Sequence, residues 1–276
     1  MTEARQSTLS RVASRDGTEI TFRSSGEGPP LVLVHGTPAD HTRWSPLLPY
    51  LEPHMTVHAM DRRGRGASGD AATYDIAREY EDVAAVVDHV ADVSGSLVDL
   101  YGHSHGGICA FGAAALTGSV RRLVLYEGWP LPDPAVYALP SALETRMDEL
   151  MAAGDRDGVV ETLFRELEDM SDEEMAAFKV LASWPGRVAV AHTITREVRG
   201  ATTARLDYEA AANIGIPVVL VSGEHSSDPS KSGIEAVAEA LPHAQIVVLE
   251  GHGHVADVLA PETFAEQFIS WLRGLP

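Results

Sequence analysis

Two hydrophobic patterns alternate along most of the chain. Short runs without polar residues, such as Leu-Val-Leu-Val at residues 31–34, predict strands that are buried on both faces of a parallel sheet. Longer stretches carry apolar residues every three or four positions, which predicts helices. Between residues 77 and 93 this helical spacing is carried by Val83, Val86, Val87 and Val90. Strands that alternate with helices predict an α/β fold.

The strand pattern predicts a mostly parallel sheet of eight strands flanked by helices. The expected strands lie around Val12 and at residues 20–23, 31–34, 56–60, 97–101, 123–126, 218–221 and 246–249. The first two are expected to form an antiparallel hairpin around Asp16 and Gly17. The last helix is expected to run from about Pro261 to Leu272.

One stretch interrupts this alternation. From residue 130 to about residue 206 the pattern is helical and rich in Met, Leu and Glu, with no strand-like run. We therefore expect a first core part at 1–130, a helical lid insertion at 131–205 and a second core part at 206–276. The expected helix breaks are at Pro140, Gly154, Pro185 and Gly200.

Composition narrows the class of partner. The chain has 276 residues, 45% of them hydrophobic, and a formal net charge of −19. Such a negative surface has no basic stripe to neutralise phosphates, so binding to nucleic acid or to an anionic membrane is not expected. The expected partner is a small-molecule substrate, and the chain is expected to be a monomer or a homodimer.

The single cysteine, Cys109, excludes an internal disulfide. The first residues lack an apolar leader-like run, and no run is long enough to span a bilayer. These features predict a cytoplasmic protein.

Ser104 stands at the centre of Gly-His-Ser-His-Gly at residues 102–106. The preceding run at 97–101 predicts a strand, and the small and apolar residues that follow predict a helix. A G-x-S-x-G motif in this context is typical of a tight strand-to-helix turn that exposes a nucleophilic serine. Glycine neighbours let the turn close without steric clashes. Ser104 is therefore the predicted nucleophile.

Four motifs stand in an order that resembles the α/β-hydrolase fold family along nearly the whole chain. They are His-Gly-Thr-Pro at 35–38, Asp-Arg-Arg-Gly-Arg-Gly-Ala-Ser-Gly at 61–69, the serine motif at 102–107, and Gly-His-Gly-His at 251–254 followed by Ala-Pro-Glu at 260–262. Lid-bearing bacterial serine esterase-like hydrolases show the closest resemblance. The resemblance implies a catalytic triad in the chain order serine, acid, histidine.

The resemblance assigns the base and the oxyanion donors. It favours His254 over His252 as the base, because the spacing from His254 to Pro261 matches the family pattern. The oxyanion hole is expected to use the backbone N–H groups of Thr37 and His105. The arginine-rich segment at 61–69 is expected to be structural, with its guanidinium groups bound to carbonyls and carboxylates.

The acid departs from the family pattern. The position after the seventh strand that usually carries an aspartate holds Ser226, which has no charge. Three carboxylates remain as candidates, namely Glu127 directly after the sixth strand, and Glu224 and Asp228 in the loop after the seventh. Glu127 is favoured, because some lid-bearing members place the acid there. The alternative for Glu127 is a structural carboxylate that ties the lid to the core.

A serine nucleophile forms an acyl-enzyme that water cleaves. The sequence thus predicts hydrolysis of a carboxylic ester or lactone of a small to medium hydrophobic substrate, and it disfavours dehalogenase or epoxide hydrolase chemistry. Trp129 and Trp184 are expected to face the substrate. The alternatives are a non-hydrolytic enzyme of this fold (a lyase, an acyltransferase or a natural-product tailoring enzyme) and a receptor-like member with a vestigial triad.

No cofactor or metal is expected. The His-x-His pairs at 103/105 and 252/254 could indicate a metal site, since histidine is a common metal ligand. However, no Asp or Cys lies at ligand spacing near either pair. The segment at 61–69 resembles a phosphate-binding loop only in its glycines and arginines, since it lacks the Walker pattern.

Overall fold

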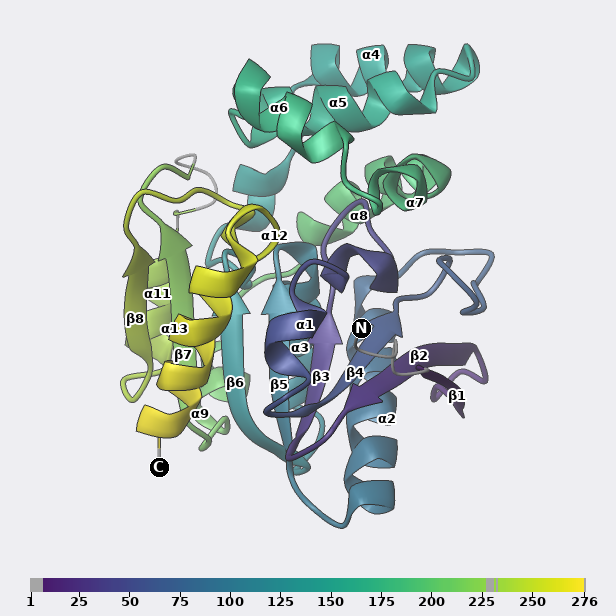
Figure 1. Ribbon diagram of the computed structural model, residues 1–276. Helices are drawn as coiled ribbons and strands as arrows, with labels where there is room; N and C mark the ends of the chain where they lie inside the picture. The colour runs from purple at the N-terminus through teal and green to yellow at the C-terminus, as the bar shows by residue number, and fades with distance from the viewer. Residues whose placement is uncertain (1–6, 227–230, 232, 276) are drawn as a thin grey trace.

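The computed structural model describes residues 7–226, 231 and 233–275. Its centre is an eight-stranded sheet in the order β1-β2-β4-β3-β5-β6-β7-β8, in which β1 and β2 pair antiparallel, as do β2 and β4, and the other neighbours are parallel (Figure 1). The strands are β1 (Thr8–Ala13), β2 (Glu19–Gly26), β3 (Pro30–Val34), β4 (Thr56–Asp61), β5 (Val98–His103), β6 (Val120–Tyr126), β7 (Val218–Gly223) and β8 (Gln245–Leu249). This confirms the predicted α/β fold and its mostly parallel sheet.

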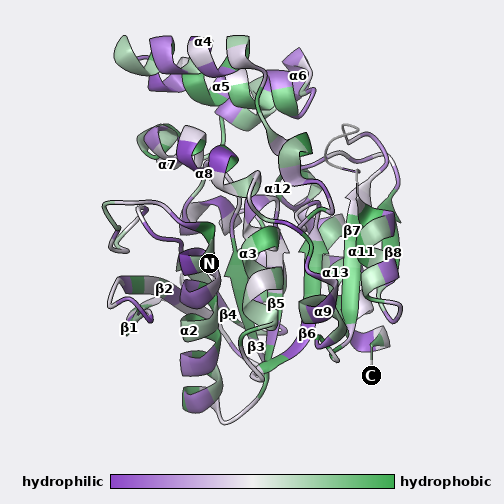
Figure 2. Cartoon of the chain, turned by 180° about the vertical axis from the view of Figure 1, so that it is seen from behind, coloured by the Kyte–Doolittle hydropathy of each residue, from purple (hydrophilic) through white to green (hydrophobic). Residues whose placement is uncertain are grey.

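Helices cover both faces of the sheet (Figures 1 and 2). One face packs against α2 (Ile76–Ser94), α3 (His105–Ala114), α9 (Tyr208–Ala212) and α11 (Ile234–Ala240). The other packs against α1 (Leu48–Leu51), α12 (Ala256–Leu259) and α13 (Pro261–Gly274). Side chains alternate between the faces along β3, so that Val32 and Val34 join the first core while Leu31 and Leu33 join the second. This alternation explains why the central strands are apolar throughout.

Between β6 and β7 the described chain forms helices and no named strand. They are η2 (Pro134–Tyr137), α4 (Ser141–Ala152), α5 (Arg156–Leu167), α6 (Asp172–Lys179), α7 (Trp184–Ala189), η3 (Ala191–Thr193) and α8 (Ile194–Ala201), with α9 following. We call residues 131–205 the helical segment. It lies beyond the end of the sheet that carries the serine turn, with α4, α5 and α6 farthest from the strands (Figure 1).

The helical segment packs around a third hydrophobic core. Met147, Phe164 and Trp184 are among the buried residues that the segment contributes, and Val255 and Val258, which follow β8, belong to the same core. Apolar packing therefore joins the helical segment to the loop that carries His254.

All four expected helix breaks lie within two residues of an observed helix boundary. Pro140 directly precedes α4 and Gly154 follows it closely, Pro185 is the second residue of α7, and Gly200 is the penultimate residue of α8. A proline is tolerated in a first turn because its missing N–H is not needed there. Among the described helices, none carries an apolar stretch long enough to cross a bilayer.

Candidate active site

Ser104 sits at the junction of β5 and α3 with φ 54° and ψ −133°. This left-handed backbone is unfavourable for a residue with a side chain, so the surrounding structure must hold it. Gly106 allows the turn to pack, because a Cβ at this position would overlap the carbonyl oxygens of Val34 and His35. The strand-to-helix turn that the sequence predicts is therefore present.

Two further glycines bring neighbouring strand ends against Ser104. A Cβ on Gly128, just beyond β6, would overlap the carbonyl oxygen of Ser104. A Cβ on Gly36, in the loop after β3, would lie 2.7 Å from the Cβ of Ser104. The ends of β3 and β6 can approach the turn only because these positions lack side chains.

His254 and Glu127 form a buried pair at the same end of the sheet. The Nδ1 atom of His254 lies 2.6 Å from Oε2 of Glu127, and their residues are 7% and 6% exposed. Glu127 directly follows β6, while His254 lies in the loop after β8. Two residues that are 127 positions apart thus meet because the carboxyl ends of parallel strands share one edge.

The second oxygen of Glu127 is bound as well. Its Oε1 accepts hydrogen bonds from the backbone N–H of Gly223 at 2.6 Å and from Oγ of Ser222 at 3.1 Å. Burial alone would raise the pKa of Glu127, but its bond to His254, together with Ser226 and the backbone N–H of Gly223, lowers it below the ordinary value. Glu127 is therefore held as a carboxylate that faces the imidazole.

The other two candidates for the acid are Glu224 and Asp228. Glu224 is exposed, and its carboxylate accepts the backbone N–H of Gly251 at 2.8 Å. Asp228 lies outside the described residues. Ser226, at the usual acid position, is buried and contributes to the low pKa of Glu127.

Ser104 and His254 line one cavity of about 360 Å³ between the sheet and the helical segment. The core contributes Thr37, His105, Ile108, Glu127 and Gly128 to its lining. The helical segment contributes Val136, Tyr137, Ala138, Pro140, Leu163, Glu166, Leu167, Glu168, Val198 and Ala201. The candidate nucleophile Ser104 and His254 therefore line a common, largely apolar cavity.

Trp129 and Trp184 are not among the residues that line this cavity, so our expectation for them needs correction. Trp129 is fully buried in the core of the sheet. Trp184 packs inside the helical segment against Phe178, and its indole N–H donates to Asp157 at 2.7 Å. Both indole rings are buried in hydrophobic cores, and sequence spacing alone does not separate a tryptophan that packs in a core from one that lines a cavity.

His103 joins the serine turn to the histidine loop. An Arg43 guanidinium N–H donates to Nδ1 of His103 at 2.7 Å, so the proton of this ring is on Nε2, which donates to the carbonyl of His254 at 2.7 Å. Arg43 also binds Asp257 at 2.6 and 2.5 Å. Burial and the charge of Arg43 lower the pKa of His103 well below its ordinary value, which keeps the ring neutral.

Thr37 and His105 flank Ser104, and their side chains point to other partners. His105 opens α3, where the first backbone N–H groups have no acceptor within the helix. Its Nε2 atom lies 2.9 Å from the hydroxyl of Tyr74. The Thr37 hydroxyl donates to Glu197 of α8. Thr37 and His105 thus contact other side chains, and both also line the cavity.

The arginine-rich segment is structural in its contacts. Arg62 is fully buried and binds both oxygens of Glu79 at 2.6 Å and Oε1 of Glu197 at 2.9 Å. Arg65 also pairs with Glu197. These contacts match the carboxylate-binding role that the family resemblance implies.

Glu79, His105 and Cys109 form a cluster that sequence spacing did not reveal. Their potential ligand atoms all lie within 4.8 Å of one another, and the three residues are buried. Both oxygens of Glu79, however, accept hydrogen bonds from the cationic Arg62. A guanidinium at this distance disfavours a metal cation at the same carboxylate.

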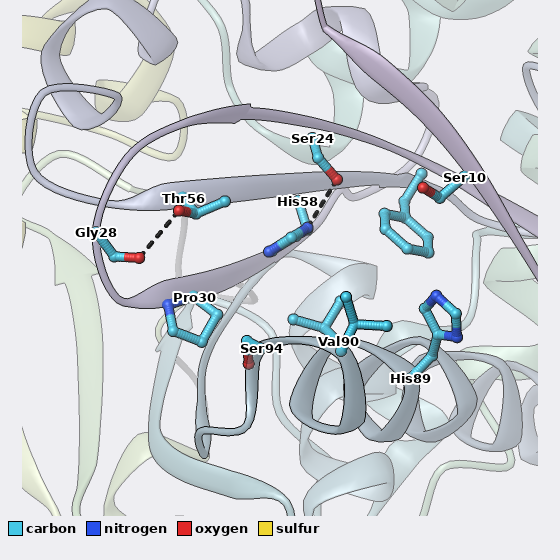
Figure 3. A pocket seen from close by; sticks show the side chains of 11 residues that line it. Ser10, Ser24, Gly28, Pro30, Thr56, His58, His89, Val90 and Ser94 are labelled. Carbon is cyan, nitrogen blue, oxygen red and sulfur yellow. Dashed lines mark hydrogen bonds between the residues drawn. The ribbon is translucent and has the colours of Figure 1, made fainter.

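A second cavity, of about 200 Å³, lies between β4 and α2, away from Ser104 (Figure 3). The lining includes Phe22, Val90 and two histidines, His58 and His89. Nδ1 of His58 lies 2.8 Å from Oγ of Ser24, and burial together with His89 lowers the pKa of His58 to about 4. Burial therefore keeps His58 neutral at physiological pH.

Comparisons with known proteins agree with this geometry. The sequence profile of the alpha/beta hydrolase family matches residues 31–267, which is most of the chain and includes all four motifs. The chain belongs to the alpha/beta hydrolase family. It is an enzyme of the alpha/beta-hydrolase type. A solved alpha/beta hydrolase from Sphaerobacter thermophilus is 34% identical with a TM-score of 0.73, and the match covers 94% of this chain and 100% of that one.

Two characterised relatives of this alpha/beta hydrolase are also similar over nearly their full lengths. The (E)-2-((N-methylformamido)methylene)succinate hydrolase of Acinetobacter baylyi is 25% identical over 257 residues, which cover 92% of this chain and 94% of the relative. A pimeloyl-(acyl-carrier protein) methyl ester esterase of Xanthomonas campestris is 27% identical over 267 residues, which cover 91% and 98%. Both relatives are hydrolases, and they differ in substrate.

Proposed function

We propose that this protein is a serine hydrolase that cleaves a carboxylic ester or a lactone through an acyl-enzyme on Ser104. In this proposal His254 is the general base and Glu127 is the acid that orients it. The backbone N–H groups of Thr37 and His105 form the oxyanion hole. Residues 131–205 act as a lid over the substrate.

The reaction proceeds in two balanced steps. Oγ of Ser104 attacks the carbonyl carbon while Nε2 of His254 takes its proton, and the imidazolium then protonates the departing alcohol oxygen. Water attacks the acyl-enzyme in the same way and releases the acid, with Ser104 restored. Glu127 keeps the Nδ1 proton in place and stabilises the imidazolium in both steps.

One observation carries the proposal. The buried pair of His254 and Glu127, with atoms 2.6 Å apart, borders the cavity that also contains Ser104 on its left-handed turn. A strained serine beside a histidine that is oriented by a carboxylate is the arrangement that activates a hydroxyl nucleophile. The cavity has apolar walls such as Ile108, Leu163 and Val198, which suits a small to medium hydrophobic substrate.

A panel of p-nitrophenyl esters tests the proposal. We expect the wild-type protein to release p-nitrophenol with burst kinetics and Ser104→Ala to fall to the uncatalysed rate, since no acyl-enzyme can form. Ser96→Ala, which changes an exposed serine, serves as the matched control and should keep full activity. Equal rates in wild type and Ser104→Ala contradict the proposal. Acyl transfer to an added alcohol with little hydrolysis identifies a transferase instead.

A further inference from the structure

Glu168 places a second carboxylate against His254. Its Oε2 atom lies 3.6 Å from Nδ1 of His254, the ring atom that also contacts Glu127. The Glu168 side chain is 19% exposed, so the contact is only partly open to solvent. Glu127 comes from the sheet, whereas Glu168 comes from the helical segment. The candidate base is thus flanked by carboxylates from two parts of the fold.

The backbone around Glu168 fixes its direction. Glu168 directly follows α5, and the next residue, Asp169, has the left-handed φ of 49°. This conformation ends the helix and turns the chain toward α6. The negative charge of Glu168 also contributes to raising the pKa of Tyr137, which lines the same cavity. Glu168 therefore faces the cavity between Tyr137 and His254.

We propose that Glu168 is a positioning residue for His254, a carboxylate that the helical segment supplies to stabilise the imidazolium form of the base. The inference rests on the proposed function, in which His254 takes the proton of Ser104. Nδ1 carries a single proton, which Glu127 accepts at 2.6 Å. Glu168 therefore acts mainly through its charge, and it does so only while the helical segment lies over the sheet.

Several groups act on His254 from the elements packed around it. They are Glu127 after β6, Glu168 after α5, Arg43 in the short helix η1 (His41–Trp44), His103 at the end of β5 and Tyr126 in β6. Burial and the charge of Arg43 lower the pKa of His254, while the charge of Glu168 and the bond to Glu127 raise it, and the net result is a pKa of about 9. The two carboxylates therefore outweigh the cost of burial.

The consequence for the pH profile follows from the role of the base. His254 accepts a proton only when it is neutral, so kcat/KM should rise with pH up to a limit near pH 9. Removing the charge of Glu168 lowers the pKa of His254, so the rise moves to lower pH. The same change makes His254 a weaker base, so the limiting value of kcat/KM at high pH falls. The profiles of wild type and variant should therefore cross.

The test compares Glu168→Gln with wild type from pH 5 to 10.5, using a p-nitrophenyl ester for kcat/KM. We expect the midpoint of the rise to fall by about one pH unit or more. The variant should be roughly threefold to tenfold faster at pH 7 and a few-fold slower at high pH. Asp169→Asn removes the same charge one residue away, keeps a residue type that tolerates the left-handed backbone, and should leave the midpoint unchanged.

An NMR titration of His254 gives a second readout that does not depend on turnover. The signal is assigned by its loss in His254→Gln, and its pKa should be lower in Glu168→Gln than in wild type and Asp169→Asn. If wild type hydrolyses no ester, the proposed function fails, while the titration still tests Glu168. An unchanged pKa overturns the inference, as does a loss of rate at every pH with the same midpoint. Glu168→Ala gives the same comparison if the glutamine variant does not fold.

Discussion

Among the described residues, the non-glycine positions with left-handed backbone are Ser104 (φ 54°), Glu127 (φ 46°) and Asp169 (φ 49°). Ser104 carries the candidate nucleophile, Glu127 contacts His254, and Asp169 follows the second carboxylate that contacts the same ring. Such conformations cost about 1–3 kcal/mol each and persist only where the surroundings impose them. All three positions lie close to His254. The backbone strain there indicates that the fold gives up some stability to orient the side chains around this histidine.

In the proposed triad, Glu127 takes the role that the family resemblance assigns to an aspartate after the seventh strand. An acid after β6 can replace one after β7 because the ends of these two strands are adjacent, with Tyr126 opposite Val221 in the parallel register. The backbone N–H of Glu127 binds the carbonyl of Val221 at 3.1 Å. A carboxylate that starts from either strand end can therefore reach the histidine loop.

Glu127→Gln tests this role. An amide at this position cannot stabilise the imidazolium and favours the wrong tautomer, so we expect kcat for ester hydrolysis to fall by about 10³–10⁴-fold. An organophosphonate should still label Ser104, but more slowly. Glu224→Gln removes the exposed carboxylate that was a rival candidate, and it should retain kcat within about twofold, since a surface change of this kind has small effects. A large loss in Glu224→Gln, with Glu127→Gln active, would reverse the assignment.

Buried ion pairs between side chains join the helical segment to the sheet. Glu197 of α8 is fully buried and binds Arg62, Arg65 and the hydroxyl of Thr37. Burial and the charge of Arg62 lower the pKa of Arg65, while the charge of Glu79 raises it. The contact with Thr37 links α8 to the loop that borders Ser104.

Glu197→Gln should therefore destabilise the protein strongly. Removing this charge leaves the buried Arg65 without its carboxylate partner and Arg62 with Glu79 alone, and we expect the free energy of unfolding in urea to fall by about 3 kcal/mol. We also expect kcat/KM to fall, because Thr37 loses its charged acceptor. Glu144→Gln breaks an exposed pair between α4 and Arg199, also on α8, and should cost less than about 1 kcal/mol. Equal effects of the two variants would show that the buried cluster does not anchor the segment.

For the protein as a whole, charge is the dominant feature. The net charge is −19, and Glu166 and Glu168 lie where the helical segment borders the cavity. The described residues that line this cavity include no lysine or arginine. The surrounding potential should therefore repel anionic substrates and attract cationic ones.

The dependence of kcat/KM on salt concentration tests this electrostatic potential around the cavity. We expect kcat/KM for anionic 4-acetoxybenzoate to rise several-fold between low and high salt, because the Debye length falls from about 30 Å at 0.01 M to about 3 Å at 1 M. For the cationic 3-acetoxy-N,N,N-trimethylanilinium it should fall, and for neutral phenyl acetate it should change little. Identical salt responses for the three esters would show that the field does not reach the reacting carbonyl.

Local patterns predicted most of the architecture. Each expected strand lies within a few residues of an observed one, because continuous apolar runs are sufficient to define buried parallel strands. The break in that pattern after β6 likewise predicted the helical segment. The expected breaks at Pro185 and Gly200 lie at the start of α7 and at the end of α8, because a proline fits a first helical turn and a glycine is common where a helix ends.

Neighbouring positions in the chain alone determined the strand-to-helix turn at Ser104 and the place of the histidine loop, because each depends on a short motif and the element that contains it. Tertiary structure decided the rest. Glu127 meets His254 because two parallel strands end side by side, and Glu168 meets the same ring because the helical segment folds back over the sheet. Nothing in the acidic stretch around residue 168 distinguishes this glutamate in sequence. Contacts between residues more than 80 positions apart depend on the order of the strands and on how the helices pack over the sheet. Local sequence spacing specifies neither of these.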